Sequence, residues 1–257
     1  MASPLSRIAS SLPKVIRLAW QRGLRDTAMI VRKNIAHEFR WYLDRRFDRI
    51  HGTDTSDNIP LDVLRIDGEN RNQGIYYEPT STDLFRHMMA QLKPALRFED
   101  FVFIDYGSGK GRTLMMASDY PFIAIIGVEF AHELHLAAEH NLSIYHGRRQ
   151  CCKDLAAVHA DATAYQPPAQ NLLVYFYNPF LKEVMGKVLG KLAQASLDHG
   201  TRIVLLYFNP LSADVVESSG LFKRRQEIRL PHDYTREVQR RCTVYFSWPE
   251  APGSAIV

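Results

Sequence analysis

The sequence predicts an α/β domain built on a seven-stranded, mostly parallel β-sheet, preceded by a basic helical arm. From residue 98 onward, short apolar runs alternate with stretches of helical periodicity, as expected of alternating strands and helices. Residues 202–208 are almost continuously apolar, which is typical of a parallel strand covered on both faces. No helix separates the last two strands, which indicates a C-terminal antiparallel hairpin.

Length and composition agree with one such domain and an appendage. The chain has 257 residues, of which 46% are hydrophobic, enough to bury a sizeable core. We divide it into a basic arm (residues 1–50), a connecting and lid segment (residues 51–97) and the sheet domain (residues 98–257). The three cysteines include no Cys-x-x-Cys pair, so we expect no disulfide framework and no zinc site. They suit a reducing compartment, and we expect a cytoplasmic protein.

The net charge of +4 is unevenly distributed. Residues 1–50 hold eleven Lys or Arg against four Asp or Glu, interleaved with apolar residues in a helical pattern. Three interpretations stay open: an arm packed on the domain, a basic surface for nucleic acid or anionic membrane, and a targeting segment. The first 25 residues contain no acid, which also fits a mitochondrial transit peptide.

The remaining elements follow from periodicity and turn residues. Residues 51–74 are rich in Asp, Asn, Gly and Thr and predict a connecting loop, and a helix over 81–92 follows, capped by Ser81 or Thr82. Pro231 begins a further loop. Strands are expected near 101–105, 123–129, 156–160, 171–177, 202–208, 222–229 and 241–248, and helices near 111–119, 131–145, 180–197 and 211–219.

The stretch from Phe101 to Thr113 is the most informative. Four apolar residues form a strand, an acid closes it, and glycines at alternate positions open a helix, a pattern that lets backbone approach a ligand closely. Arg112 stands where a dinucleotide fingerprint needs its last glycine, and Ile104 and Gly111 exclude a P-loop. The candidate residues of this loop are Asp105, Gly107, Ser108, Gly109 and Gly111.

Polar residues also end the next three predicted strands. They are Glu129, Asp161 and Asn178. In a doubly wound sheet these ends meet at the edge where ligands bind, and Glu129 has the spacing of an acid that holds ribose hydroxyls. Each residue taken alone is also explained as a helix cap or a solvated loop residue.

The Asp-x-Gly-x-Gly-x-Gly pattern resembles motif I of the class I S-adenosylmethionine (SAM) methyltransferases. The resemblance covers roughly residues 76–210 and implies a Rossmann-like methyltransferase fold with SAM as cofactor. It implies that the glycine loop packs on the methionine end of SAM and that Asp161 lies near the adenine amino group.

Asn178-Pro179-Phe180 resembles motif IV of methyltransferases that act on nitrogen, although one proline of that motif is missing. The resemblance implies that the Asn178 side chain and the adjacent carbonyl accept hydrogen bonds from the target amine, and that the ring of Phe180 packs on it. The alternative is that Asn178 caps the following helix, with Pro179 in its first turn.

The upstream segment Tyr76-Tyr77-Glu78-Pro79-Thr80 is similar to a lid of the non-SET protein-lysine methyltransferases. This resemblance implies that Tyr77 and Thr80 fold over the cofactor. Glu78 replaces the apolar residue that is usual there. A simple turn formed by Pro79 and Thr80 is the alternative explanation.

We therefore expect a SAM-dependent methyltransferase that acts on nitrogen, with a protein lysine as the favoured acceptor. Two alternatives stay open: a nucleic-acid methyltransferase that uses the basic arm, and a catalytically inactive SAM-fold binding module. We interpret His132, His135, His140 and His146 as surface histidines of one helix and expect no metal, because their spacing does not match a zinc motif. Lys110 and Arg112 are either contacts to the cofactor carboxylate or solvated.

Overall fold

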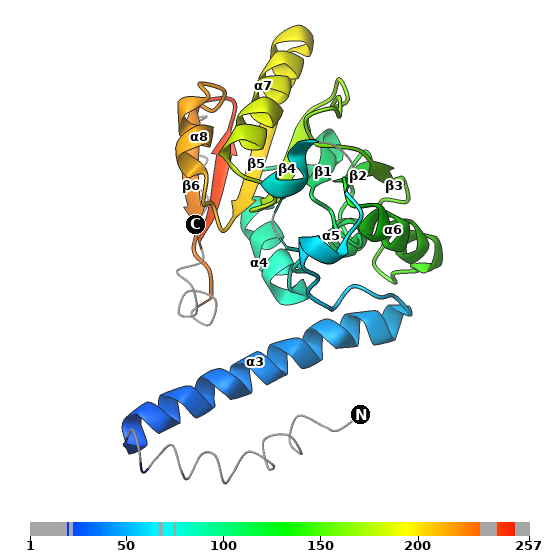
Figure 1. The fold of residues 1–257 in the computed structure, drawn as a ribbon. Helices are drawn as coiled ribbons and strands as arrows, with labels where there is room; N and C mark the ends of the chain where they lie inside the picture. The colour runs from blue at the N-terminus through cyan, green and yellow to red at the C-terminus, as the bar shows by residue number, and fades with distance from the viewer. Residues whose placement is uncertain (1–19, 21–22, 67–68, 75, 232–240, 250–257) are drawn as a thin grey trace.

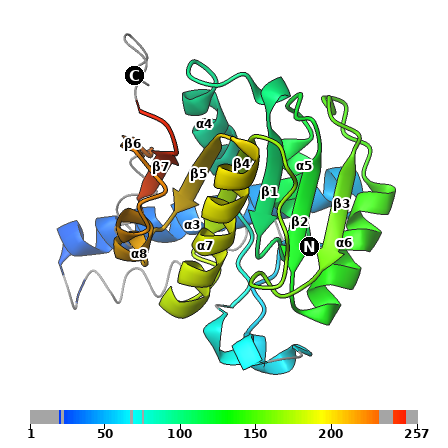
Figure 2. The same cartoon turned by 90° about the horizontal axis from the view of Figure 1, so that it is seen from above.

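Seven strands form one sheet in the order β3-β2-β1-β4-β5-β7-β6 (Figures 1 and 2). β7 runs antiparallel to both of its neighbours, β5 and β6, and all other pairs of neighbouring strands are parallel. All seven predicted strands and the terminal hairpin are confirmed. Their bounds are β1 Val102–Tyr106, β2 Ile125–Glu129, β3 Leu155–His159, β4 Leu172–Tyr177, β5 Ile203–Phe208, β6 Arg224–Ile228 and β7 Cys242–Phe246.

The computed structural model describes residue 20 and residues 23–66, 69–74, 76–231 and 241–249. The expectations for residues 1–19 and 21–22, which include most of the suggested transit peptide, lie outside this part of the chain. So does the loop after Pro231. The helices are α3 Leu24–His51, α4 Thr82–Leu92, α5 Arg112–Ala117, α6 His132–Ile144, α7 Lys182–His199 and α8 Ala213–Ser218, with 3-10 turns η1 Leu61–Val63, η2 Glu69–Gln73 and η3 Phe98–Asp100.

The sheet separates two hydrophobic layers. Side chains alternate between the faces of a strand, so β1, which is apolar except for Asp105, and the wholly apolar β5 supply both layers, and every residue in them is buried. One layer lies between the sheet and α4 with α5, around Phe85 and Phe103. The other lies between the sheet and α7 with α8, around Ile104 and Val188. The two layers fix the carboxyl ends of the central strands at one edge.

Helix α3 extends past the body of the domain on the side of α4 and α5 (Figure 1). It contacts the domain near its last turns, where Phe47 is buried in the α4–α5 layer. The helix ends at Gly52, which adopts the left-handed conformation common after helices. Within the described part of the chain, every helix is too short or too polar to cross a lipid bilayer.

Residues 52–81, which we call the covering segment, connect α3 to α4. The sequence predicted a plain loop over most of this stretch, but the segment is held across the carboxyl edge of the sheet by single β-bridges. Ile59 pairs with Tyr77, within the segment. Ile66 pairs with Ala131, just after β2, and Gly74 pairs with Phe180, just after β4. The covering segment therefore lies over the strand ends that carry the candidate residues.

Candidate functional site

A pocket opens at the carboxyl edge of the sheet beneath the covering segment. It encloses about 600 Å³ of empty space, counting the open solvent at its mouth. Of the residues predicted from the sequence, the following line it: Tyr77, Thr80, Asp105, Gly107, Ser108, Glu129, Asn178 and Pro179. Asp161 and Phe180 instead line an adjoining pocket that shares Gly107 and Pro179 with the first.

The glycine loop needs its glycines for conformation and for packing. Gly107 has φ +82° and Gly109 has φ +54°, in the left-handed region that other residues avoid. A Cβ at Gly107 would lie 2.8 Å from Cβ of Pro179, and one at Gly109 would lie 2.1 Å from the Tyr77 ring. The close neighbours are thus the end of β4 and the covering segment, which themselves line the pocket. Gly111, with φ +80°, starts α5.

Asp105 is the buried acid at the end of β1. Its side chain is 3% exposed, and burial raises its pKa to about 7, although a hydrogen bond from Thr113 acts in the opposite direction. The nearby Glu129 carboxylate adds to the upward shift. Asp105 therefore gains and loses a proton near neutral pH, inside the pocket.

Glu129 fastens the glycine loop to the next strand. Its Oε2 accepts a hydrogen bond of 2.8 Å from the backbone N–H of Gly109, and its Oε1 accepts one of 2.9 Å from that of Ala131. Burial raises its pKa, although both hydrogen bonds oppose the shift. Each carboxylate oxygen can accept more than one hydrogen bond, so Glu129 can still accept hydrogen bonds from ligand hydroxyls.

The pKa of Asp105 predicts how stability depends on pH. Because the folded pKa is about 7 and the ordinary value is 3.8, the folded state holds a proton that the unfolded chain releases between these values. The free energy of unfolding should fall as the pH rises through this window, by roughly 1.4 kcal/mol per pKa unit. Glu129 contributes with the same sign. We expect Asp105→Asn to reduce the slope, measured by urea unfolding at several pH values, and an unchanged slope would contradict this assignment.

Asp161 is held by a partner that the sequence analysis missed. Its Oδ2 accepts a hydrogen bond of 2.7 Å from Nδ2 of Asn70 in η2, and its Oδ1 accepts bonds of 2.7 Å from the N–H and hydroxyl of Thr163. Burial acts to raise the pKa of Asp161, but these hydrogen bonds outweigh it and lower the pKa. Asp161 thus links the covering segment to the adjoining pocket, among Val128, Ala160, Ala162 and Phe180.

Asn178 follows β4 and does not cap the next helix. Helix α7 begins at Lys182 with Leu181 in the capping position, so the capping alternative is wrong. The backbone of Asn178 is left-handed, with φ +43°, which asparagine tolerates better than most residues. Its side chain is 6% exposed, and its Oδ1 has no hydrogen-bond partner among the described residues. An unpartnered acceptor therefore lies at the pocket, beside Pro179.

Strand β5 is also followed by a left-handed asparagine and a proline, but this asparagine does not line the pocket. Asn209 follows β5, precedes Pro210 and has φ +53°, and Asn178 and Asn209 are the two non-glycine residues with positive φ in the described part of the chain. Asn209 does not line either pocket described above. It provides a matched control for Asn178.

Of the two lid residues, Tyr77 lies over the glycine loop and Thr80 lies against β4. Tyr77 is buried with its ring against Gly109, and its hydroxyl donates a 2.8 Å hydrogen bond to the carbonyl of Thr55. The hydroxyl of Thr80 lies 2.9 Å from that of Tyr175 on β4. Ser81 occupies the capping position of α4 but makes no side-chain capping bond. The lid is thus bonded to the residues around it.

Several residues around the pocket differ from the sequence interpretation. Lys110 and Arg112 are buried and not solvated, and Arg112 lines the pocket. Tyr175, which the sequence analysis treated only as part of an apolar strand, also lines the pocket. It is two residues from Tyr177 on β4, so both side chains lie on one face of the sheet, and this spacing could have identified Tyr175 as a pocket residue.

The histidines are also arranged differently. His135 is buried and stacks on His159, with ring centroids 5.1 Å apart, so it is not a surface residue. His146 lies beyond the end of α6. Among the described residues, no group of three or more His, Cys, Asp or Glu side chains is placed to hold a metal ion.

The strand order and the antiparallel β7 define the fold of the class I SAM-dependent methyltransferases. No family model and no curated protein matches the chain. Among solved structures it is similar to a ribosomal protein L11 methylase from Lactobacillus delbrueckii subsp. bulgaricus, with 14% identity over 71% of this chain and 83% of that one and a TM-score of 0.45.

Two further solved structures are similar. One is a SAM-dependent methyltransferase from Leishmania major, with 11% identity over 64% of this chain and 72% of that one and a TM-score of 0.48. The other is a precorrin-6y C5,15-methyltransferase from Geobacter metallireducens, with 16% identity over 75% of this chain and 100% of that one and a TM-score of 0.44. Likenesses of this size do not extend to substrate or mechanism.

Proposed function

We propose that this chain is a SAM-dependent methyltransferase that methylates a nitrogen, with a protein lysine as its acceptor. The observation that most supports this proposal is that four features line one pocket. These are the glycine loop, the buried Asp105 and Glu129, the lid, and the unpartnered oxygen of Asn178.

The residues around the pocket suit SAM. Oγ of Ser108 and Oδ1 of Asn178 are buried without hydrogen-bond partners among the described residues. A buried polar atom left in this state costs about 1–3 kcal/mol, so both atoms favour a polar ligand. In this proposal the backbone of Gly107 to Gly109 holds the methionine end, Glu129 accepts hydrogen bonds from ribose hydroxyls, and Asp161 lies beside the adenine.

Bound SAM supplies an electrophilic methyl group on a sulfonium. The task of the chain is to present a nucleophile in line with that group and to exclude water. The acceptor ammonium group would first lose a proton to solvent, and Oδ1 of Asn178 would then accept a hydrogen bond from the neutral amine N–H, so that the nitrogen lone pair faces the sulfonium methyl group. Pro179 holds the position of this amide against Gly107, and Tyr77 covers the loop from the other side.

The charge around the pocket supports an amine acceptor. The carboxyl group of Glu78 lines it, together with Asp105 and Glu129, whose raised pKa values reduce their negative charge, and with Arg112, which pairs with Asp48. Glu78 lies near the mouth, where it accepts a 3.2 Å hydrogen bond from the hydroxyl of Tyr76, and Tyr76 is 52% exposed. A carboxylate beside an exposed aromatic ring favours an approaching lysine ammonium group.

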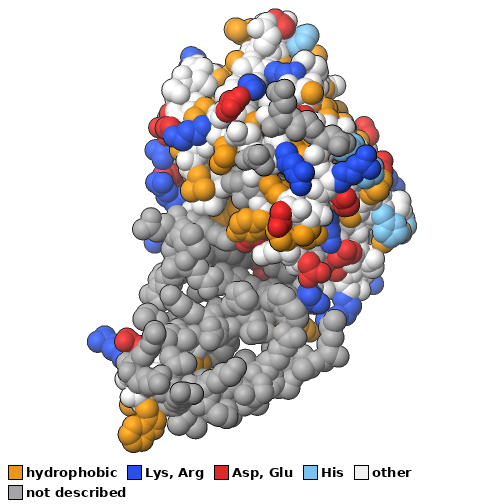
Figure 3. Space-filling model, viewed as in Figure 1, with side chains coloured by type: hydrophobic (Ala, Val, Ile, Leu, Met, Phe, Trp, Pro, Cys, Tyr) orange, Lys and Arg blue, Asp and Glu red, His pale blue; other side chains and the backbone are white. Residues whose placement is uncertain are grey.

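The surface offers less support for nucleic acid. Acidic and basic side chains are interspersed on the face of the sheet domain seen in Figure 3. A nucleic-acid backbone binds through a continuous group of basic residues, which this face does not present in the part that the structure describes.

Methyl transfer from tritiated SAM tests the proposal. The purified chain is incubated with tritiated SAM and, separately, with protein, nucleic-acid and metabolite fractions of a cell extract. We expect label in the protein fraction, recovered as methyl-lysine after acid hydrolysis. Label in nucleic acid or metabolites would contradict the lysine assignment. No label in any fraction, from a chain that binds SAM, would favour a catalytically inactive binding module.

A further inference from the structure

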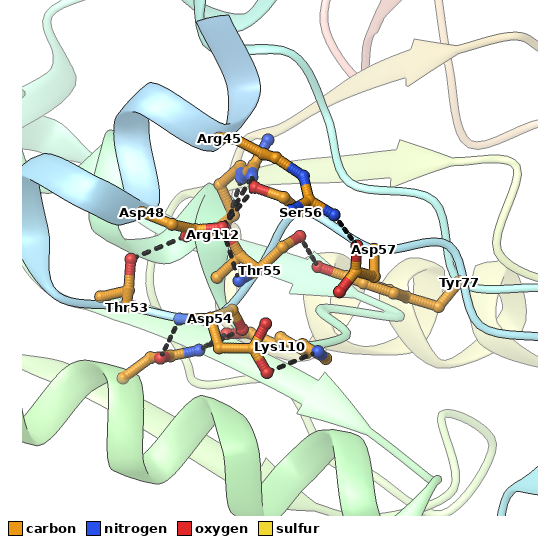
Figure 4. Close-up of polar contacts among 11 residues, drawn as sticks. Arg45, Asp48, Thr53, Asp54, Thr55, Ser56, Asp57, Tyr77, Lys110 and Arg112 are labelled. Atoms are coloured by element: carbon orange, nitrogen blue, oxygen red, sulfur yellow. Dashed lines mark hydrogen bonds and ion pairs between the residues drawn. The ribbon is translucent and has the colours of Figure 1, made fainter. Parts of the chain in front are cut away.

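A buried polar cluster joins the last turn of α3 to the start of α5 (Figure 4). Its centre is the carboxylate of Asp48. Oδ1 accepts hydrogen bonds from the hydroxyls of Thr53, at 2.8 Å, and Thr55, at 2.6 Å. Oδ2 accepts a 3.0 Å bond from the N–H of Thr55 and a further bond from the hydroxyl of Ser56. The Asp48 side chain thus holds the first residues of the covering segment in place by hydrogen bonds.

Arg112 brings the glycine loop into the same cluster. Its side chain is 1% exposed, its Nε donates a 2.6 Å hydrogen bond to the hydroxyl of Thr55, and its Nη2 lies 3.5 Å from Oδ2 of Asp48. The guanidinium also lies over the ring of Phe47, 5.5 Å from its centroid. A guanidinium cannot lose its charge in a protein, so its burial requires the carboxylate nearby.

The carboxylate is kept in its charged form. Burial acts to raise the pKa of Asp48, but hydrogen bonds from Ser56, Thr55 and Thr53 outweigh it and lower the pKa. Asp48 therefore stays ionised at neutral pH, and the cluster contains a full ion pair.

The lid is connected to this cluster through Thr55. The carbonyl of Thr55 accepts the hydrogen bond from the Tyr77 hydroxyl, and the Tyr77 ring covers Gly109. A chain of direct contacts thus runs from the arm through Thr55 to the lid residue that contacts the glycine loop.

A second connection fixes the glycine loop itself. Nζ of Lys110 lies 2.9 Å from Oδ2 of Asp54, and the Asn141 side chain in α6 bonds to the backbone of both Asp54 and Lys110. The start of the covering segment is therefore bonded to two successive polar residues of the loop region, Lys110 and Arg112.

We infer that Asp48 and Arg112 are positioning residues of the cofactor pocket, so that the end of the N-terminal arm sets how tightly the lid closes and how tightly SAM binds. The inference rests on the proposed function. Asp48 acts through Thr55 and Tyr77, and Arg112, whose side chain also lines the pocket, holds Thr55 in place. The last turn of α3 then belongs to the cofactor site in function.

The test compares Asp48→Asn with Asp57→Asn in the full chain. The second variant makes the same chemical change nine residues further along the chain, in the covering segment, but removes only the exposed ion pair with Arg45. Calorimetric titration with S-adenosylhomocysteine should show a Kd at least about tenfold higher for Asp48→Asn, at unchanged stoichiometry, and no change for Asp57→Asn. Lower stoichiometry at unchanged Kd would mean a merely structural role and would overturn the inference.

Hydrogen exchange at the Tyr77 amide gives a second readout that needs no ligand. This amide donates a 2.9 Å bond to the carbonyl of Ile59. Its exchange should be at least about tenfold faster in Asp48→Asn than in Asp57→Asn, because the lid opens more often. Equal rates would contradict the inference. If the wild-type chain binds no S-adenosylhomocysteine, the proposed function fails and this measurement alone decides the positioning role.

Tyr77→Phe covers the case in which Asp48→Asn does not fold. It removes only the hydroxyl that bonds to Thr55 and keeps the ring on Gly109. We expect a higher Kd for S-adenosylhomocysteine and faster exchange at residue 77. Wild-type values in both measurements would show that the connection through Thr55 does not support the lid.

Discussion

Gly107→Val should abolish binding of SAM and S-adenosylhomocysteine. A left-handed backbone costs a residue with a Cβ about 1–2 kcal/mol, and a β-branched residue more. The new Cβ would also lie 2.8 Å from Cβ of Pro179, so either the glycine loop or the end of β4 must move. Both line the pocket. Calorimetric titration with S-adenosylhomocysteine should show a Kd raised on the order of 100-fold or more.

Gly186→Val is the control for this prediction. Gly186 is an exposed residue of α7, and a Cβ there has no neighbour within 4 Å. The same substitution should change stability by less than about 1 kcal/mol, because valine is a somewhat better helix former than glycine, and leave binding unchanged. Circular dichroism of both variants separates loss of the site from loss of the fold. Wild-type affinity in a folded Gly107→Val variant would contradict the placement of the cofactor.

Asn178→Ala should spare cofactor binding and lower turnover on the order of 100-fold. The proposed contribution of this side chain is to orient the acceptor nitrogen, a role that matters when the methyl group moves. The variant should therefore lower kcat with little change in the Kd for S-adenosylhomocysteine. Single-turnover transfer from tritiated SAM to the labelled protein fraction measures the first quantity, and calorimetry measures the second.

Asn209→Ala isolates the backbone part of that effect. Asn209 has φ +53°, close to the φ of +43° at Asn178, and it also precedes proline, so alanine suffers similar strain at both positions. Only Asn178 lines the pocket. Turnover should stay near wild type in Asn209→Ala. A similar loss in both variants would mean that strain, and not the amide oxygen, accounts for the defect.

The sheet could be predicted from local patterns because its central strands are buried on both faces. β5 is apolar throughout and β1 is apolar except for Asp105, and that pattern marks a covered parallel strand without any knowledge of its partners. The parallel strands then bring the residues after β1, β2 and β4 to one edge. This is why Asp105, Glu129 and Asn178 could be grouped before their positions were known.

Contacts between distant parts of the chain could not be predicted in this way. Asp48 and Arg112 are 64 residues apart, and Asn70 and Asp161 are 91 apart, so no periodicity or spacing relates them. Arg112 illustrates the difficulty, since an arginine at a helix start is solvated unless a carboxylate is folded against it. The covering segment has the composition of a loop, and its position depends on these contacts.

The glycine loop has one feature that the local sequence predicts, its glycine spacing, and one that it does not, its contacts with distant residues. Its spacing predicted a ligand site at the strand ends, and in the fold its glycines also pack against Pro179 and Tyr77. Pro179 is 72 residues from Gly107 along the chain and Tyr77 precedes it by 30. The spacing therefore indicated that side chains are excluded at Gly107 and Gly109, but only the folded structure shows that Pro179 and Tyr77 exclude them.

A crystal structure of the chain grown with S-adenosylhomocysteine tests the central claim most directly. We predict electron density for the ligand in the pocket between Gly107 and Asn178, with its ribose hydroxyls at Glu129. Density for the ligand elsewhere, or a pocket filled by the chain's own side chains at saturating ligand, would contradict the assignment of this site.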